Sequence, residues 1–244
     1  MAGWKLEASF SGLADAFGDL DKVFDLQGEQ ITKDAISEVI RVELAGVRYY
    51  VKRYRSAGKG LRRYLSRTRV KTEWRNLKRF AKWGVATAQV VAAGQERNLG
   101  AFTRGALITR ELAGTDDLAV LVSQNDARLG DPLWVRSVSA QVAAITRHLH
   151  DHHFTHNDLK WRNLLVDRAG QVFLIDCPSG SFWWGAALRY RIIKDLACLD
   201  KVAKKQLSRS QRLRFYLQYL GRQRLNASDK QRLRKVIGFF EGRE

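Results

Sequence analysis

Side chains that can move a phosphoryl group are concentrated in residues 156–163, which read His-Asn-Asp-Leu-Lys-Trp-Arg-Asn. Asp158 supplies a carboxylate that can accept a hydroxyl proton, and Lys160 supplies a cation for a migrating phosphate. Asn163 offers an amide oxygen, and Asp176, thirteen residues later, offers a second oxygen ligand of the kind that Mg²⁺ prefers. This spacing predicts a catalytic loop followed by a metal-binding aspartate, the arrangement that transfers a γ-phosphoryl group.

The pattern has two halves, the loop at residues 156–163 and the aspartate within Ile175-Asp176-Cys177. Either half alone is common and would fit a solvated loop between strands, so the prediction depends on finding both in this order. Two short apolar runs, 164–167 and 172–175, flank a turn at residues 168–170 and predict a buried hairpin. That hairpin would return Asp176 to the catalytic loop. The two halves in register therefore favour the catalytic interpretation.

Phosphoryl transfer also needs a lysine for the α- and β-phosphates. Alternating residues at 39–44 and 47–52 predict a β-hairpin that turns at Ala45-Gly46. Lys52 lies near the end of its second strand and is the candidate phosphate lysine. The alternative is an ordinary exposed strand lysine.

A glutamate on a neighbouring helix should orient that lysine. Residues 70–83 have helical spacing and contain one acid, Glu73, which would face Leu77 and Phe80. Glu73 is therefore the candidate ion-pair partner, and a surface helix acid is the alternative. Residues 107–112 predict the end of a strand, after which Glu111 and Leu112 would form the hinge that meets adenine through backbone groups.

The pattern along the chain changes from hairpins with a single helix, up to about residue 110, to mostly helices from Asp131 onward. Asp131-Pro132 is a fair helix N-cap, and apolar residues then recur at three- and four-residue steps up to Leu149. Two more helices are predicted near the C-terminus, the last after a capping-box-like sequence at residues 228–231.

The order Lys52, Glu73, Glu111, residues 156–163 and Asp176 resembles the protein-kinase-like superfamily. Asp-Cys-Pro at 176–178, in place of Asp-Phe-Gly, and Arg-Ile-Ile-Lys-Asp-Leu-Ala at 191–197 are similar to bacterial lipopolysaccharide core kinases that phosphorylate heptose. The similarity covers roughly residues 20–220. It implies an α+β, two-lobed protein-kinase-like fold, one kinase-like domain with a small β-rich N-lobe at 1–112 and a mainly helical C-lobe at 113–244.

The resemblance also implies an ATP-dependent sugar kinase with Mg²⁺ as cofactor. Its partner would be the lipopolysaccharide core glycolipid or a precursor, and its location cytoplasmic, at the inner face of the inner membrane. Asp195 would brace the catalytic loop through backbone hydrogen bonds, or else be a helix N-terminal acid favoured by the macrodipole. The roles implied are catalysis by Asp158 and Lys160, nucleotide binding by Lys52, Glu73, Glu111 and Leu112, and metal binding by Asn163 and Asp176.

The chain departs from the protein-kinase pattern in three places. No G-x-G-x-x-G precedes Lys52, and Gly28 stands alone there, so other backbone geometry must cover the phosphates. The Ala-Pro-Glu that closes the activation segment is missing. Only nineteen positions separate Asp176 from Asp195, which favours a small or carbohydrate acceptor over a peptide.

The segment between Asp176 and Asp195 contains apolar and basic side chains that would suit an anionic amphiphile as acceptor. These are Trp183, Trp184, Arg189, Arg191 and Lys194. The alternative is that both tryptophans simply pack inside the protein.

The formal net charge of +18 predicts attraction to polyanions. Residues 52–71 carry nine basic side chains and no acid, and residues 201–244 carry thirteen basic and three acidic ones. These runs could steer a phosphorylated acceptor, contact an anionic membrane surface, or merely form solvated faces. Nucleic acid is not an expected partner once the catalytic residues are considered.

The remaining reactive side chains give weaker signals. All five histidines lie between residues 148 and 156; His148 and His152 could share a helix face and bind zinc, whereas His150 and His156 match kinase-loop positions whose rings brace backbone. Cys177 and Cys198 are predicted to be free thiols. No secretory signal is visible, and the longest apolar run, 182–188, is too short to span a bilayer.

Two classes of function therefore stay open. The first is a sugar phosphotransferase of the lipopolysaccharide core, within which a protein kinase or an antibiotic phosphotransferase remains an alternative. The second is a polyanion-binding protein that keeps a kinase-like frame without turnover. Intact Asp158, Asn163 and Asp176 favour the first, because binding alone needs none of the three.

Overall fold

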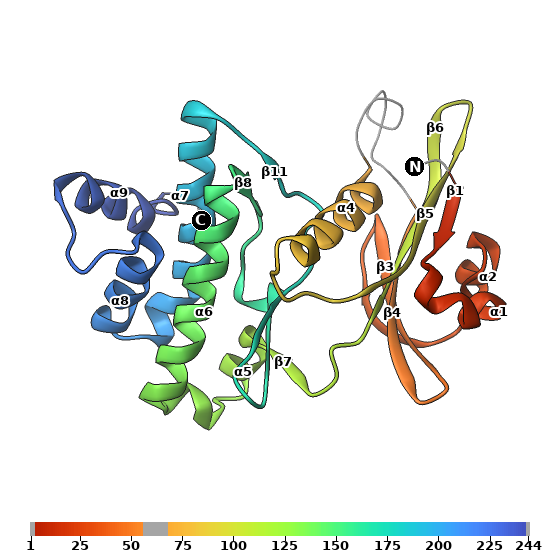
Figure 1. The fold of residues 1–244 in the computed structure, drawn as a ribbon, viewed down its shortest axis with the longest axis horizontal. Coiled ribbons are helices and arrows are strands. Elements are labelled where there is room, and N and C mark those ends of the chain that lie inside the picture. The colour runs from red at the N-terminus through yellow and green to blue at the C-terminus, as the bar shows by residue number, and fades with distance from the viewer. Residues whose placement is uncertain (1–2, 56–67, 243–244) are drawn as a thin grey trace. The chain divides into compact units, whose positions relative to one another are not determined.

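The computed structural model of the protein describes residues 3–55 and 68–242, and the chain divides into two compact units, Met1–Ala113 and Gly114–Glu244 (Figure 1). Strands dominate the first unit and helices the second. The predicted α+β fold class is therefore confirmed.

An antiparallel six-stranded sheet is the frame of the first unit, with the strand order β1-β5-β6-β4-β3-β2. Side chains alternate between the two faces of each strand, so register decides which face a residue occupies. The strands are β1 Gly3–Leu6, β2 Glu29–Lys33, β3 Ser37–Leu44, β4 Val47–Tyr54, β5 Val90–Asn98 and β6 Ala101–Arg110.

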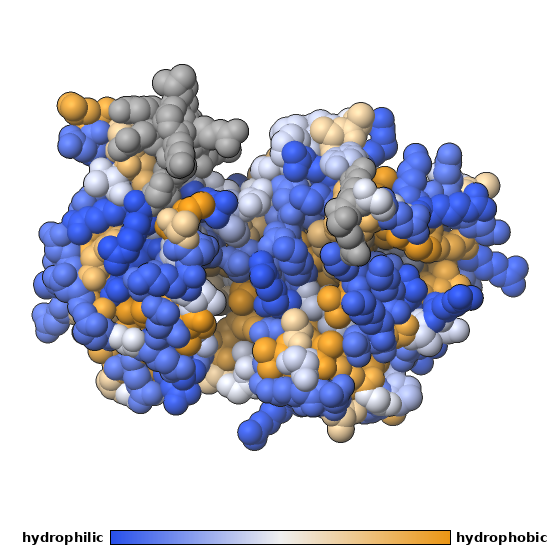
Figure 2. Space-filling view, turned by 180° about the vertical axis from the view of Figure 1, so that it is seen from behind, coloured by the Kyte–Doolittle hydropathy of each residue, from blue (hydrophilic) through white to orange (hydrophobic). Residues whose placement is uncertain are grey.

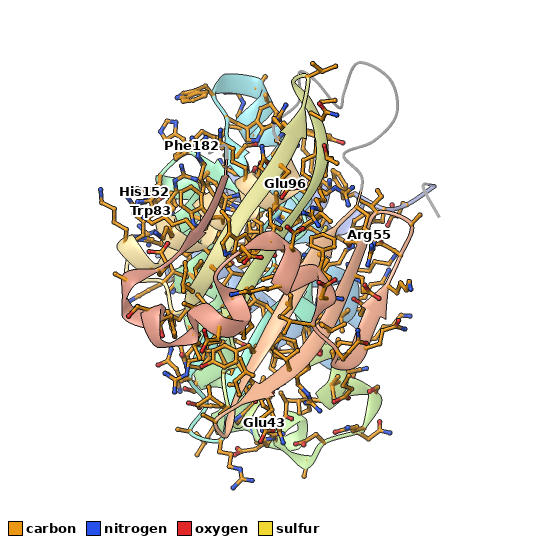
Figure 3. All side chains as sticks on the ribbon, turned by 90° about the vertical axis from the view of Figure 1, so that its right-hand side faces the viewer. Glu43, Arg55, Trp83, Glu96, His152 and Phe182 are labelled. Carbon is orange, nitrogen blue, oxygen red and sulfur yellow. The ribbon has the colours of Figure 1, made fainter. Side chains whose placement is uncertain are left out.

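The predicted hairpin at residues 39–52 is confirmed as β3 and β4. Ala45 and Gly46 form its turn with φ of 50° and 74°, the left-handed values of a type I′ turn. Figure 3 shows Glu43 near this turn and Arg55 just past the other end of β4. Lys52 is paired with a neighbouring strand on each side, which fixes its position within the sheet.

Helices cover both faces of this sheet (Figure 1). On one face α4, Arg69–Lys82, packs against β5 and β6; on the other lie α1, Ala14–Phe17, and α2, Leu20–Asp25, which follow the 3₁₀ helix η1, Ala8–Leu13. Phe17 joins β4 and β6 residues in a buried core. The expectation of one helix in this part was wrong, because helices of four and six residues are too short to show an apolar period.

A long helix leads to the catalytic loop in the second unit, as predicted. This helix, α6, spans Pro132–Asp151, and the Asp131 side chain caps it by accepting a 2.8 Å hydrogen bond from the backbone N–H of Leu133. The helix buries Val135, Val142 and Leu149. It is preceded by α5, Leu118–Ser123, and by the 3₁₀ helix η2, Ala127–Gly130.

Two small sheets hold the loop segment. The predicted hairpin is present as β9, Leu164–Asp167, and β10, Val172–Leu174. A third strand, β7, Thr115–Asp117, pairs with β9 and was not predicted, because three residues carry no recognisable alternation. In the other sheet β8, Phe154–Thr155, pairs with β11, Ser181–Phe182.

Three further helices complete the second unit: α7 Gly185–Gln206, α8 Arg209–Leu220 and α9 Ala227–Ile237. The capping box predicted at 228–231 was wrong. Asn226 caps α9, and the Asp229 side chain accepts a hydrogen bond from the Asn226 backbone N–H, because asparagine caps helices as well as serine does. Within residues 3–55 and 68–242, no helix combines the length and apolar character that crossing a membrane requires.

Candidate active site

Lys52 and Glu73 form an ion pair in the first unit. The Lys52 ammonium lies 3.0 Å from Oε2 of Glu73, whose side chain is only 5% exposed. The Tyr54 hydroxyl donates a hydrogen bond to the same carboxylate. The predicted pairing is confirmed, and Glu73 is not a surface acid; that the pair binds phosphates stays a prediction.

The local structure explains this pairing. Lys52 and Tyr54 alternate along β4 with residues of the opposite face, so both can meet the helix α4. Glu73 lies on the same buried helical stripe as Leu77 and Phe80. A buried carboxylate needs charged or hydrogen-bonding partners, and the strand supplies both.

Glu111 and Leu112 follow β6 directly, where the hinge was predicted. The Glu111 backbone N–H donates to the Arg48 carbonyl at 2.9 Å, and its carboxylate accepts a 3.3 Å hydrogen bond from the Tyr50 hydroxyl. The Glu111 N–H is therefore committed to the sheet. We expect any adenine contact here to use the Glu111 carbonyl or the backbone of Leu112, and this stays a prediction.

The loop between β2 and β3 is closed by a side chain instead of glycines. The Asp34 carboxylate accepts hydrogen bonds of 2.6 Å from the backbone N–H groups of Ile36 and Ser37, and these bonds lower the pKa of Asp34. Gly28 has a packing role: a Cβ there would lie 2.4 Å from the Arg41 carbonyl oxygen. Neither feature is a phosphate-binding glycine loop.

Asp158 lies in the second unit, between β8 and the 3₁₀ helix η3, Trp161–Asn163. Its carboxylate faces two cations of its own loop, with Lys160 Nζ 2.6 Å from Oδ1 and Arg162 Nη2 3.4 Å from Oδ2. The Asp158 side chain is 30% exposed. An accessible carboxylate beside a cation is the combination that proton removal next to a phosphate requires.

Asn163 and Asp176 are brought together by the β9–β10 hairpin. The backbone N–H of Ile175 donates to the Asn163 carbonyl at 3.0 Å, so the hairpin pairing continues one step beyond its strands. Asp176 comes next in the chain. The amide nitrogen of Asn163 donates to the Asp158 carbonyl at 2.8 Å, which leaves the amide oxygen as its ligand atom. The hairpin thus gathers two oxygen ligands near the candidate base.

Asp176 has a left-handed backbone conformation, with φ of 55°. Few residues other than glycine adopt it, aspartate and asparagine most readily, and such strained positions cluster at functional sites. His156 contacts the backbone just before Asp176, because its Nε2–H donates to the Ile175 carbonyl at 3.3 Å. Burial lowers the pKa of His156, so the ring is neutral at neutral pH. Its predicted bracing of the backbone is confirmed.

Asp195 braces the catalytic loop, as the resemblance implied. This fully buried carboxylate accepts 2.8 Å hydrogen bonds from the backbone N–H groups of His156 and Asn157. Asp195 lies in the middle of α7, so the alternative of a helix N-terminal acid was wrong. The carboxylate fixes the two residues that precede Asp158.

The His150 ring was expected to bond the backbone, and this was wrong. Among the described residues, its two ring nitrogens contact side chains. Nε2 lies 3.4 Å from Asp195 Oδ2, and Nδ1 lies 2.9 Å from the Tyr219 hydroxyl. Burial raises the pKa of Tyr219, which keeps that hydroxyl protonated and able to donate. His150 therefore orients Asp195, which in turn accepts the hydrogen bonds of the loop.

Replacing Asp195 with alanine should lower the stability of the second unit. Asp195→Ala leaves two buried N–H groups without their acceptor, and we expect a loss of about 3 kcal/mol in the free energy of unfolding. Chemical denaturation measures it. The control is Asp151→Ala, whose carboxylate is 66% exposed and pairs with Arg147, and its stability should stay near that of the parent protein. Equal losses in both variants would contradict the bracing role.

The zinc alternative gains no support from the residues that the structure describes. Among them, no group of three or more histidine, cysteine, aspartate or glutamate side chains is placed to hold a metal ion. The rings of His148 and His152 lie 4.5 Å apart, and His152 Nδ1 donates to the His148 carbonyl. Cys177 and Cys198 are buried free thiols, as predicted, and burial raises the pKa of Cys198 to about 11.

The two tryptophans of the segment that follows Asp176 differ in burial. Trp184 is 68% exposed, whereas Trp183 is half-buried beneath Arg191, whose guanidinium lies 3.6 Å from the ring centre. Packing inside therefore holds for Trp183 only. Arg191 also donates to the Asn157 side chain at 2.9 Å, so it is not a free acceptor-binding cation. Sequence reasoning missed Asn157, although an asparagine between His156 and Asp158 is a signal for left-handed backbone.

The basic runs lie on the surface only in part. Figure 2 shows hydrophilic side chains over most of the face it presents. In the second run Lys204, Lys205 and Arg209 are exposed, and Arg212 pairs with Asp200. The basic side chains of these runs that lie outside the described residues are Lys59, Arg62, Arg63, Arg67 and Arg243.

Within the second unit, the arrangement presents a proton acceptor, a cation and two oxygen ligands on one loop and hairpin. Proton removal from a hydroxyl, phosphate neutralisation and magnesium binding are the three tasks of phosphoryl transfer. The first unit supplies a lysine held by a buried glutamate. The geometry of each unit fits that reaction.

Comparison with known proteins points in the same direction. The model of the lipopolysaccharide kinase (Kdo/WaaP) family matches residues 21–219. The lipopolysaccharide core heptose(I) kinase WaaP of Pseudomonas aeruginosa is 29% identical over 159 residues, which are 63% of this chain and 59% of that protein. The 3-deoxy-D-manno-octulosonic acid kinase of Actinobacillus succinogenes is 29% identical over 145 residues, 54% of this chain and 57% of that protein. The matches thus span less than two thirds of either relative's length.

A solved structure extends the likeness to nearly the whole fold. A structure described as WaaP in complex with acyl carrier protein has a TM-score of 0.75 with this chain at 25% sequence identity. The match covers 98% of this chain and 99% of that one.

Proposed function

The chain belongs to the lipopolysaccharide kinase (Kdo/WaaP) family, and we propose from this membership that it transfers the γ-phosphoryl group of ATP to a sugar hydroxyl, a heptose hydroxyl, of the lipopolysaccharide inner core. The observation that carries the proposal is the pair of hydrogen bonds that join the loop to the hairpin. The Asn163 amide nitrogen donates to the Asp158 carbonyl, and the backbone N–H of Ile175, the residue before Asp176, donates to the Asn163 carbonyl. A protein that only bound polyanions would have no chemical use for that set.

Each residue has a definite task in this proposal. Asp158 accepts the proton of the sugar hydroxyl as the oxygen attacks phosphorus. Lys160 leaves its pairing with Asp158 to neutralise the migrating phosphate, and Lys52, oriented by Glu73, binds the α- and β-phosphates. Glu111 and Leu112 bind adenine through the backbone.

The ligand set fits magnesium. One carboxylate, from Asp176, and one amide oxygen, from Asn163, match an ion that takes few protein ligands and completes its shell with phosphate oxygens and water. Asn163 and Asp176 would hold Mg²⁺, which would supply positive charge to neutralise the charge that develops during transfer. The left-handed backbone of Asp176 and the hydrogen bond of the Asn163 amide nitrogen restrict the positions that these two ligand groups can adopt.

The acceptor is proposed to be carbohydrate. The chain from Asp176 to Asp195 is short, and β11 and α7 take up most of it, which favours a small or carbohydrate acceptor over a peptide. Trp184 and Arg189 are exposed and could contact a sugar ring and its anionic substituents. Because such sugars are held on a membrane lipid, we also propose a cytoplasmic protein that works at the inner face of the inner membrane, where its positive charge attracts anionic headgroups.

An acceptor panel tests the substrate class. The protein is incubated with γ-labelled ATP and Mg²⁺, and dephosphorylated core oligosaccharide, a generic protein and an aminoglycoside are offered in parallel. We expect label on the oligosaccharide alone. Label on the protein or the aminoglycoside would move the chain to another class of acceptor, and nucleotide binding without transfer would favour the polyanion-binding alternative.

Removing the charge of Glu73 should weaken ATP binding. Glu73→Gln loosens Lys52, and we expect the KM for ATP to rise about tenfold, because a charge-assisted hydrogen bond contributes about 1.5 kcal/mol. Steady-state kinetics at varied ATP measures this rise. The matched control is Glu43→Gln, at a residue labelled in Figure 3, which breaks the exposed Arg48–Glu43 pair of the same sheet and should leave the KM unchanged. An unchanged KM in Glu73→Gln would remove the pair from the nucleotide site.

A further inference from the structure

Asn157 occupies the position between the loop histidine and Asp158 and is tied to three other segments. Its φ is 65°, and its side chain is buried. The amide oxygen accepts hydrogen bonds from Thr155 Oγ1 at 3.1 Å and Arg191 Nη1 at 2.9 Å. The amide nitrogen donates to the Ser179 carbonyl at 2.7 Å. The amide therefore uses both acceptor sites and one donor on groups of the protein itself.

These contacts link the catalytic loop to the chain that follows Asp176. Ser179 lies three residues after Asp176, and Arg191 reaches in from α7, where it also covers Trp183. Two further contacts join the same segments. The backbone N–H of Trp183 donates to the His153 carbonyl, and β11 pairs with β8. Residues 177–183 are thus hydrogen-bonded to residues 153–157 at several points, and Asn157 makes one of these contacts through its side chain.

The residue type at this position determines whether the segment after Asp176 can be ordered by a phosphate group. Protein kinases carry arginine here, in His-Arg-Asp, and their activation segments are commonly ordered by pairing of arginine with a phosphorylated residue. Asn157 is neutral and has no charge with which to attract a phosphate. The partners of its side chain are the Ser179 carbonyl, the Thr155 hydroxyl and the Arg191 guanidinium, all of which the chain itself supplies. The link is complete without any modification.

We propose that Asn157 and Arg191 form a permanent latch that positions Asp176 and Asp158 for transfer, so that this chain needs no phosphorylation of the segment after Asp176. Both are positioning residues, because neither is expected to touch the substrates. The proposal deepens the proposed function and rests on it for its kinetic consequence. Its structural consequence, the ordering of residues 177–183, does not depend on activity.

The test combines kinetics with hydrogen–deuterium exchange on the full chain. Asn157→Gly removes the amide while glycine tolerates the left-handed backbone, and Arg191→Gln removes the guanidinium. We expect kcat to fall about tenfold to a hundredfold in each, since small misplacements of reacting groups have such effects, while the KM for ATP changes less than about threefold. Exchange of the amides of residues 177–183 should accelerate about tenfold.

The matched controls are Asn125→Gly, an exposed asparagine with φ of 52° in the same unit, and Arg136→Gln, an exposed arginine on α6. Both should keep parental kcat and exchange. Changes in kcat and exchange no larger than those of the controls would overturn the latch, and so would a requirement for prior phosphorylation of the chain. If the parent protein transfers no phosphate, the proposed function fails, while exchange in Asn157→Gly and Arg191→Gln still decides the latch. Should Asn157→Gly not fold, Arg191→Gln alone carries both measurements.

Discussion

Asp158→Asn is expected to lose at least about a thousandfold in phosphate transfer while binding ATP with nearly parental affinity. Removing a general base has effects of about 10²–10⁴ in rate, and asparagine keeps the size of the side chain but cannot take the proton. The nucleotide does not depend on this carboxylate, so its affinity should change less than about threefold. Transfer is followed with labelled ATP, and affinity by calorimetry.

The control for Asp158→Asn removes one negative charge elsewhere. Asp151→Asn lies at the exposed end of α6 and should retain parental transfer. Asp158→Asn also breaks the pairing with Lys160 and Arg162, so loss of ATP binding would show that the variant disturbed the loop itself. Turnover close to that of the parent protein would show that Asp158 is not the base.

Asp176→Asn is expected to lose the response to magnesium. Asparagine accepts the left-handed backbone of Asp176, so the hairpin and segment should keep their structure, and only the charged ligand is lost. We expect transfer to fall at least about a hundredfold and the Mg²⁺ concentration for half-maximal activity to rise by at least about tenfold. A magnesium titration of transfer and of ATP binding measures both effects.

Asp116→Asn is the matched control, because Asp116 pairs with Arg128 on the surface of the same unit. It should leave the magnesium response unaltered. The metal assignment is contradicted if Asp176→Asn keeps the parental half-saturation for Mg²⁺. It is also contradicted if ATP binds that variant equally well with and without the metal while the parent protein shows a large difference.

The sequence was sufficient where a local pattern determines the structure. The β3–β4 hairpin follows from alternation and the turn at Ala45-Gly46, and the β9–β10 hairpin from two apolar runs around Gly170. The Lys52–Glu73 pair could also be predicted, because phosphoryl transfer needs a lysine that a glutamate on a neighbouring helix orients, and Glu73 is the one acid of the predicted helix. The two hairpins are decided by interactions within a few residues, whereas the pair joins β4 to α4 and follows from the order of the kinase-like residues along the chain.

The rest depends on contacts between distant segments. The partners of Asn157 come from β8, the segment after Asp176 and α7, and no spacing in the sequence reveals them. Arg191 was expected to contact the acceptor because it is a cation near the loop, yet it packs on Trp183. The His150 ring was expected to bond backbone and instead orients Asp195. Side-chain direction in these cases is set by tertiary packing.

The most direct test of the central claim is transfer to the proposed acceptor itself. The protein, ATP and Mg²⁺ are incubated with dephosphorylated inner-core heptose oligosaccharide, and the products are examined by mass spectrometry and phosphorus NMR. The account predicts a phosphate monoester on a core sugar with one ADP formed for each, and no product with Asp158→Asn. An oligosaccharide left unmodified by the parent protein while ATP is consumed, or a product formed equally by Asp158→Asn, would contradict it.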